Sequence, residues 1–398
     1  MTRRRAHIAM VGIPAVSHVL PSLEVIRELV ARGHRVTYAN DPAVADLVAA
    51  TGAELVPCSS VLPVADNDWP EDPIAAMGLF LDDAIQALPQ LRAAYDPDPA
   101  DLYLYDIGAY AARALAETQG RSLIQLSPTF VAWNGYDQDV AAHLWRLPGA
   151  DAYRAKFARW LTDCGASTTD VDVFPGRPAR TLALITRAMQ PHADQVDMST
   201  VTFVGPCFDT RGSRETWTRP AGADKVLLIS LGSAFTRQPE FYRQCLAAFG
   251  DLPGWHVVLQ IGKHTDPREL GSVPSNVDVR SWVPQRAILE KADAFVTHAG
   301  MGGCGEGLLA GVPMIAVPQA ADQFMNADRL VELGVARRID TPDATAENLR
   351  AALDELVTDP EVARRSATLS ADARAEGGTA RAADLIEGLL RQETPLSR

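Results

Sequence analysis

The sequence predicts an α/β protein built from two doubly wound domains with parallel sheets. Short apolar runs alternate with amphipathic stretches along most of the chain, which is typical of strands separated by helices. The alternation stops at a segment rich in Gly, Pro, Thr and Arg and then starts again. The chain has 398 residues, enough for two or three domains of ~150 residues each. Strands flanked by helices imply parallel sheets covered on both faces.

The first series opens with an apolar run at residues 7–13, which we expect to be a strand. A helix is expected over residues 22–32, where apolar side chains recur three and four positions apart. Pro21 suits the first turn of that helix, and Gly33 suits its end. Further strands are expected at residues 36–38, 102–105, 123–126 and 181–185.

The second series has expected strands at residues 226–231, 257–261, 277–279, 294–296 and 314–317. We therefore divide the chain into a first domain (1–205), a linker (206–224), a second domain (225–378) and a C-terminal helix (379–398) that crosses back to the first domain. Open parallel sheets bind ligands at the carboxyl ends of their strands. Two such domains are expected to face each other across a cleft.

Composition excludes several classes of protein. The 37 Lys and Arg against 50 Asp and Glu give a net charge of −13, which argues against a nucleic-acid or anionic-membrane binder. No apolar run approaches the ~20 residues of a membrane span. The five cysteines are scattered and form no C-x-x-C pair, so we expect neither a disulfide frame nor a zinc site, and we expect a cytoplasmic protein.

The most informative segment is residues 294–318, where an apolar run leads into a glycine-rich turn and a helix. Its glycines let the backbone approach a ligand, and the helix N-terminus offers free N–H groups to a phosphate. His298 stands at the end of the strand and could donate to the same phosphate. Gly300–Gly305 also fits G-x-G-x-x-G, with Asp322 about twenty residues further on, so a nicotinamide or flavin site remains an alternative.

Several spaced motifs resemble a known family. Four segments resemble the donor signature of nucleotide-sugar glycosyltransferases with two Rossmann-like domains, the GT-B architecture. They are Trp282-Val283-Pro284-Gln285, His298-Ala299-Gly300, Glu306 and Asp322-Gln323. The match is to the inverting family that includes plant UDP-glycosyltransferases and bacterial antibiotic glycosyltransferases. The closest likeness is to actinomycete macrolide glycosyltransferases, and it covers nearly the whole chain.

The resemblance implies a role for each donor residue. Trp282 would stack on the nucleobase, Gln285 would bind base or ribose, and Glu306 would accept from the ribose hydroxyls. His298 and the backbone at Gly300, Gly302, Gly303 and Cys304 would hold the pyrophosphate. Asp322 and Gln323 would bind the sugar, and Ser233 and Thr236 would touch phosphate or sugar. Trp282 as a core residue and Asp322 as a helix cap are the alternatives.

Cys304 departs from the family, which commonly has a serine there. A thiol is the weaker hydrogen-bond donor. Because a serine hydroxyl would meet a phosphate oxygen, we expect weaker donor binding from the cysteine.

Two polar residues are expected at the carboxyl edge of the first sheet. His18 follows the first strand, just before the first helix, and Asp106 ends another strand. A neutral imidazole suits a general base near pH 7, and a carboxylate can orient it. The family has this pair at the matching positions, although the loop with Val16 and Leu20 is more apolar here. Taken alone, both residues could equally be helix caps.

Two segments, 69–81 and 130–145, are unusually apolar for loops and predict the acceptor surface. Met77 and Phe80 come from the first segment, and Trp133 and Tyr136 from the second. For residues 77–81 the alternative is a buried helix stripe.

Together these features predict an inverting glycosyltransferase that moves a hexose from a UDP- or dTDP-sugar to a hydroxyl of a hydrophobic natural product, a macrolide antibiotic being the leading candidate. The alternatives are an oxidoreductase that uses Gly300–Gly305 and a non-catalytic nucleotide-sugar-binding homologue that assists a partner enzyme. We expect no cofactor, no catalytic metal and no nucleic-acid partner, and we leave open a homodimer. The sequence leaves the sugar, the base and the acceptor unnamed.

Overall fold

A computed structural model describes residues 5–65, 68–208, 216–232 and 236–392. Two compact units divide the chain, and neither is continuous in sequence. The first comprises Met1–Ile185, His192–Phe208 and Gly377–Arg398, and the second comprises Thr186–Pro191 and Asp209–Glu376. The expected linker 206–224 therefore starts at the boundary near Phe208, and its residues 209–215 lie outside the described part.

The first unit is built on a seven-stranded parallel sheet of order β3-β2-β1-β4-β5-β6-β7. Every neighbouring pair in this sheet is parallel. Its strands are β1 (His7–Val11), β2 (Arg35–Asn40), β3 (Glu54–Pro57), β4 (Leu102–Asp106), β5 (Ser122–Ser127), β6 (Thr181–Ala183) and β7 (Val201–Phe203). Its helices are α1 (Val16–Ala31), α2 (Ala45–Ala49), α3 (Pro73–Tyr95), α4 (Tyr110–Thr118), α5 (Ala142–Leu144), α6 (Ala150–Cys164), α7 (Val173–Gly176) and α14 (Gly378–Gln392).

The second unit has a six-stranded sheet of order β10-β9-β8-β11-β12-β13, again parallel throughout. Its strands are β8 (Lys225–Ser230), β9 (Trp255–Gln260), β10 (Val277–Arg280), β11 (Ala294–Thr297), β12 (Met314–Ala316) and β13 (Ala336–Arg338). Its helices are α8 (Pro239–Phe249), α9 (Gln285–Leu289), α10 (Met301–Ala310), α11 (Gln323–Glu332), α12 (Ala346–Thr358) and α13 (Pro360–Ala375). The predicted fold class is confirmed.

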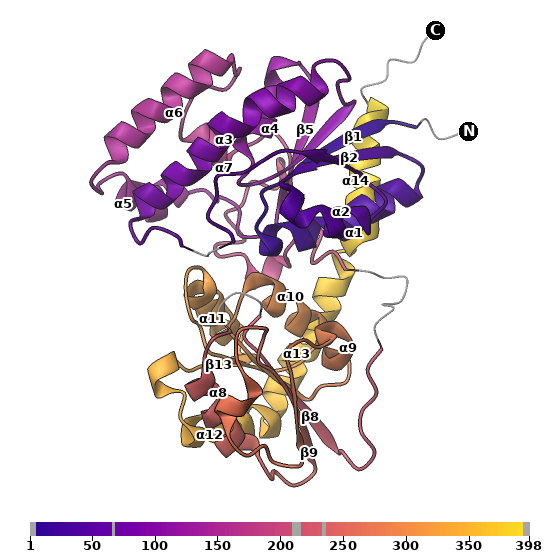
Figure 1. The fold of residues 1–398 in the computed structure, drawn as a ribbon, viewed down its shortest axis with the longest axis vertical. Helices are drawn as coiled ribbons and strands as arrows, with labels where there is room; N and C mark the ends of the chain where they lie inside the picture. Colours follow the sequence, from indigo (N-terminus) through magenta and orange to yellow (C-terminus); the bar gives the residue numbers. More distant parts are fainter. Residues whose placement is uncertain (1–4, 66–67, 209–215, 233–235, 393–398) are drawn as a thin grey trace. The chain divides into compact units, whose positions relative to one another are not determined.

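Each sheet is covered on both faces, because successive strand residues point to opposite sides. Ala9 and Val11 of β1 pack with α3, α4 and α6, whereas Ile8 and Met10 pack with α1 and α14. In the second unit β8 divides in the same way between a cluster with α8 and α12 and a cluster with α9, α10 and α11. Figure 1 shows α3, α4 and α6 gathered on one side of the first sheet and α1, α2 and α14 on the other.

The C-terminal helix α14 belongs to the first unit and lies against α1 (Figure 1). Its buried Glu387 accepts hydrogen bonds from Arg32 Nη1 at 3.2 Å and pairs with His34 Nε2 at 3.1 Å. Ala382, Ala383, Ile386 and Leu389 complete the apolar cluster under α1. These charged and apolar contacts fix the last helix on a unit that the chain left at residue 208.

Three short edge strands were not expected: β3, β7 and β13. Two segments also differ from their predicted form. The first helix begins at Val16, six residues early, because the carbonyl of Ala15 accepts from the N–H groups of His18 (2.9 Å) and Val19 (3.0 Å). Pro21 therefore lies inside the helix instead of in its first turn. Residues 73–81, expected as a loop with a helix at 77–81 as the alternative, form the start of α3, which Asp72 caps by accepting from the N–H of Ala75. The helix alternative for residues 77–81 is confirmed.

Within the described ranges, no helix is long and apolar enough to cross a membrane.

Candidate functional site

The carboxyl ends of β1 and β4 bring His18 and Asp106 together. These two strands are neighbours in the sheet, and the chain order reverses between them, which is where open α/β sheets bind ligands. His18, in the first turn of α1, places Nδ1 2.9 Å from Oδ2 and 3.1 Å from Oδ1 of Asp106. The carboxylate can only accept, so Nδ1 carries a proton, and in the neutral ring the lone pair is on Nε2.

Asp106 is almost fully buried, with 2% of its surface exposed, whereas the His18 side chain keeps 26%. The N–H of Gly108 donates to Asp106 Oδ1 at 2.8 Å, which fixes the carboxylate from its other side. A buried carboxylate with two hydrogen-bond partners, next to a partly exposed imidazole, is an arrangement that can orient a general base. The alternative that Asp106 caps the following helix is wrong, because Ala109 is the N-cap residue of α4 and no side chain makes a cap bond there.

The four predicted acceptor residues lie in two different settings. Met77 and Phe80 stand on α3, are partly buried, and pack against the apolar cluster of that face. Phe80 stacks on Trp69 at 5.7 Å between ring centroids, and its Cδ1 would lie 3.3 Å from a Cβ placed on Gly108. Phe80 therefore reaches the edge that carries Asp106, as an acceptor wall requires.

Trp133 differs from its expected role as a pocket surface. Only 6% of it is exposed, its Nε1 donates to Asp139 Oδ2 at 2.9 Å, and the rings of Tyr136 and His192 each pack on it at 5.0 Å. A ring enclosed in this way anchors the 131–139 segment. Tyr136, half-buried beside it, keeps part of its surface free. A small cavity of about 20 Å³ lies at the same sheet edge, between Gly12, Ser60, Asp83 and Gly108.

The glycine-rich turn of the second unit forms the start of α10. Gly300 is the N-terminal flanking residue, so the N–H groups of Met301, Gly302 and Gly303 have no acceptor within the helix. Cys304 is the first residue whose N–H is used, in a bond to the carbonyl of Gly300 at 3.0 Å. Three free N–H groups at a helix N-terminus can receive an anion.

Cys304 is a correction to the sequence interpretation. Its side chain is fully buried in the apolar cluster of α9, α10 and α11, and burial raises the pKa of the thiol. With its N–H also engaged, neither group of Cys304 is presented to a ligand. Sequence motifs do not reveal which way a side chain leaves the first turn of a helix, so the departure from serine was misjudged.

His298 lies at the strand reversal of the second sheet, at the end of β11 and beside the end of β8. Its ring is wedged between two glycines. A Cβ on Gly232 would lie 2.6 Å from Cε1, and one on Gly300 would lie 2.5 Å from Nε2. Burial lowers the pKa of His298 to about 4, so the ring is neutral at pH 7. Its Nδ1 is buried without a hydrogen-bond partner among the described residues.

Gln285 and Glu306 are in contact, and Trp282, three residues before Gln285 in the chain, is 61% exposed. The core alternative for Trp282 is therefore wrong. Gln285 Nε2 donates to Glu306 Oε2 at 2.5 Å. Burial raises the pKa of Glu306, although Gln285 and the nearby Arg286 act in the opposite direction. An exposed aromatic ring and a carboxylate are the groups that can hold a base and a ribose.

Asp322 and Gln323 open α11. Asp322 is exposed, and its side chain makes no cap bond, although it occupies the capping position. Gln323 is buried, and its Oε1 accepts from the N–H groups of Gln319 (2.8 Å) and Ala320 (3.1 Å). Of this pair, Asp322 presents its carboxylate, whereas Gln323 mainly holds the preceding loop.

Thr236 and Ser233 complete the donor prediction. Thr236 is fully buried, and its Oγ1 has no hydrogen-bond partner among the residues that the structure describes. A Cβ on Gly262 would lie 2.3 Å from that hydroxyl, so only glycine fits there. Ser233 lies outside the described residues.

Sequence reasoning missed Asn326 and Thr297, two fully buried polar residues that hydrogen-bond to the His298 turn. Asn326 stands four residues after Asp322, a spacing that puts both on one helix face and could have drawn attention to it. No group of three or more His, Cys, Asp or Glu side chains suited to a metal ion occurs in the described part of the chain.

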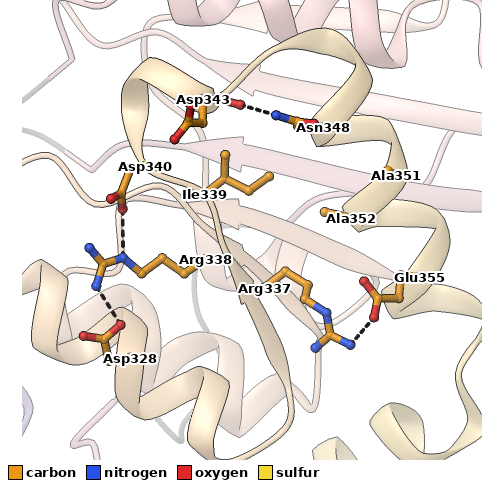
Figure 2. Close-up of a pocket in the computed structure, with 10 residues that line it drawn as sticks. All are labelled: Asp328, Arg337, Arg338, Ile339, Asp340, Asp343, Asn348, Ala351, Ala352 and Glu355. Atoms are coloured by element: carbon orange, nitrogen blue, oxygen red, sulfur yellow. Dashed lines mark hydrogen bonds and ion pairs between the residues drawn. The ribbon is translucent and has the colours of Figure 1, made fainter.

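A separate open depression of about 740 Å³ lies beside the edge strand β13 (Figure 2). Arg338 donates to Asp340 Oδ1 (2.8 Å) and Asp328 Oδ1 (2.6 Å), and Arg337 pairs with Glu355. Figure 2 shows both guanidinium groups directed at these carboxylates. The lining has four carboxylates against two guanidinium groups, so this surface has no excess positive charge with which to bind an anion.

Comparison with known proteins gives a consistent result. Residues 206–375 match the family described as UDP-glucoronosyl and UDP-glucosyl transferase. The oleandomycin glycosyltransferase of Streptomyces antibioticus is 56% identical over 392 residues, covering 97% of this chain and 91% of that protein. An NDP-glycosyltransferase of Bacillus licheniformis is 35% identical, covering 96% of this chain and 98% of its own.

Solved structures agree. The glycotransferase of kitacinnamycin superposes with a TM-score of 0.90 at 53% identity, covering 97% of this chain and 99% of its own. A calicheamicin glycosyltransferase superposes with a TM-score of 0.88 at 32% identity, covering 98% and 100% of the two chains.

Replacing Cys304 by serine is expected to change stability and leave donor binding alone. The hydroxyl would enter an apolar cluster, which costs about 1–3 kcal/mol where no acceptor is met. We expect a lower midpoint in urea unfolding and a donor KM within twofold of the parent. Cys245→Ser, at a similarly buried position on α8, is the matched control. A several-fold lower donor KM in Cys304→Ser alone would show that the side chain does reach the donor.

Proposed function

The chain belongs to the GT-B glycosyltransferases, and on that premise we propose that it transfers a hexose from a UDP- or dTDP-sugar to a hydroxyl of a macrolide, with inversion at the anomeric carbon. Family membership excludes the oxidoreductase alternative. The observation that carries the proposed mechanism is the His18–Asp106 pair at the strand reversal of the first sheet. The acceptor class rests on the relative that acts on oleandomycin.

In the proposed reaction, Nε2 of His18 takes the proton of the acceptor hydroxyl while the hydroxyl oxygen attacks the anomeric carbon. The bond between that carbon and the phosphate oxygen breaks at the same time, and the electron pair leaves with the nucleoside diphosphate. The new bond to the acceptor oxygen forms on the face of the anomeric carbon opposite to the broken bond, so an α-linked donor gives a β-linked product. Asp106 keeps Nδ1 protonated and stabilises the imidazolium that forms.

On the donor side, the roles follow from what each group exposes. The indole of Trp282 offers a stacking face to the base, and Glu306 offers acceptors to the ribose. The free N–H groups of Met301, Gly302 and Gly303, with the helix dipole behind them, would receive the charge of the leaving diphosphate. Neutral His298 would act as a hydrogen-bonding group there and not as a cation.

Trp282→Ala is expected to weaken UDP binding without affecting folding, because the exposed ring contributes little to the core. Stacking of a base on an aromatic ring is worth ~1–3 kcal/mol, so the Kd should rise by roughly 5- to 150-fold. Titration calorimetry with UDP measures this, and Trp282→Phe should recover part of the loss. Unchanged UDP affinity in Trp282→Ala would remove Trp282 from the site.

We further propose that turnover needs no divalent metal and no other cofactor. The helix N-terminus supplies the charge complement that a metal would otherwise provide. Activity measured with excess EDTA should equal activity in added magnesium. Loss of activity in EDTA that magnesium restores would contradict this.

His18→Ala is expected to remove most transfer to an aliphatic alcohol, by ~10²–10⁴-fold in kcat, while UDP affinity is unchanged. Asp106→Asn should cost less, because the imidazole remains but loses its orienting charge. The double variant should resemble His18→Ala, since an orienting group without a base has no further effect.

His143→Ala, at an exposed histidine of α5, should keep full activity. Multiplied losses in the double variant would mean that His18 and Asp106 act separately, and retained turnover in His18→Ala would overturn the mechanism.

A further inference from the structure

Asn326 is a buried side chain that joins two segments of the donor region. It lies on α11, with none of its surface exposed. Its Nδ2 donates to the carbonyl of Ala299 at 2.9 Å and to Asp322 Oδ2 at 2.9 Å. Both partners can only accept, so the amide orientation is fixed by chemistry. The Oδ1 of Asn326 is left buried without a partner among the described residues.

The backbone that Asn326 holds is unusual. Ala299 has φ +61°, in the left-handed region that a residue with a Cβ seldom adopts. It separates His298 from Gly300, so its conformation sets where the imidazole points and where α10 begins. The backbone N–H and carbonyl of Ala299 both bond to buried side chains. Thr297 Oγ1 accepts from the N–H at 3.2 Å, and Asn326 donates to the carbonyl.

The second segment has the same character. Ala321 also has a positive φ, +54°, immediately before Asp322. The exposed Asp322 carboxylate receives the second hydrogen of the Asn326 amide. Strained residues that stand beside ligand-binding groups often store conformations that the site needs. Here one amide group reaches both strained turns.

We propose that Asn326 is a positioning residue that aligns the His298 turn with the Asp322 carboxylate, so that the diphosphate and the sugar of the donor are held in one fixed relation. This inference rests on the proposed function. Asn326 acts through Ala299 and Asp322 and touches no reacting atom.

A packing role would predict a different result. Leucine is close to asparagine in size and would remove the unpartnered oxygen, so leucine would serve simple packing at least as well. Loss of the amide instead leaves the Ala299 carbonyl without a donor and frees the Asp322 carboxylate. The measurable quantity is the ratio of the Kd for UDP-glucose to the Kd for UDP, which isolates the contribution of the sugar.

Titration calorimetry is carried out on the full chain with UDP and UDP-glucose, for the parent, Asn326→Leu, Asp322→Ala and the double variant. Asn326→Leu should weaken UDP binding somewhat, because the His298 turn is loosened. It should raise the ratio of the Kd for UDP-glucose to the Kd for UDP about tenfold. Asp322→Ala should raise the same ratio and leave the Kd for UDP unchanged. In the double variant the ratio should rise no further than in Asp322→Ala, because Asn326 acts on the sugar through Asp322. In turnover, the donor KM of Asn326→Leu should rise more than kcat falls.

Asn348→Leu is the matched control. Asn348 lies exposed on α12, and its Nδ2 donates to the carbonyl of Asp343 at 2.8 Å, so it loses the same kind of bond away from the site. Its Kd ratio should equal that of the parent. If Asn326→Leu does not fold, Asn326→Ser, which can donate to only one of the two acceptors, should still raise the ratio.

An unchanged ratio in the folded Asn326 variant would overturn the proposal, as would increases that multiply in the double variant. A parent protein that binds neither UDP nor dTDP would instead overturn the proposed donor and this inference with it.

Discussion

The reversal of strand order in each sheet is the constraint on which the rest of the site depends. In a parallel sheet, chains that leave two neighbouring strands in opposite directions leave a gap at the carboxyl edge. In the first unit the gap falls between β1 and β4 and holds His18 and Asp106. In the second it falls between β8 and β11 and holds Gly232 and His298. One topological rule thus places both the proposed base and the turn proposed to bind the phosphates.

Much of this could be predicted because buried parallel strands are continuous apolar runs. The central strands were found, and so was the pairing of His18 with Asp106, since Asp106 ends β4 and His18 lies in the first helical turn after β1. The edge strands β3, β7 and β13 escaped because they have only three or four residues and little apolar pattern. The early start of α1 was missed because Pro21 suggested a boundary, yet the first turn forms upstream without needing its N–H.

Side-chain direction accounts for most of the remaining differences. Trp282 and Trp133 are the same residue type, but one is largely exposed and the other is enclosed by two rings. Cys304 shares a motif with the free N–H groups, but it faces the apolar cluster. Such directions depend on helix phase and on neighbours distant in sequence. The Asn326 bridge depends on a left-handed alanine, and no local sequence pattern predicts one.

The return of α14 to the first unit has a consequence for modular engineering. A first unit taken as one continuous N-terminal piece lacks the helix that supplies Ile386 and Leu389 to its apolar cluster and Glu387 to Arg32 and His34. A hybrid enzyme that exchanges the donor-binding unit should therefore keep α14 with its own α1 and join the parents near residue 376 as well as near residue 208. The gene segment to be exchanged is therefore internal, and the two junctions that bound it have to be chosen together.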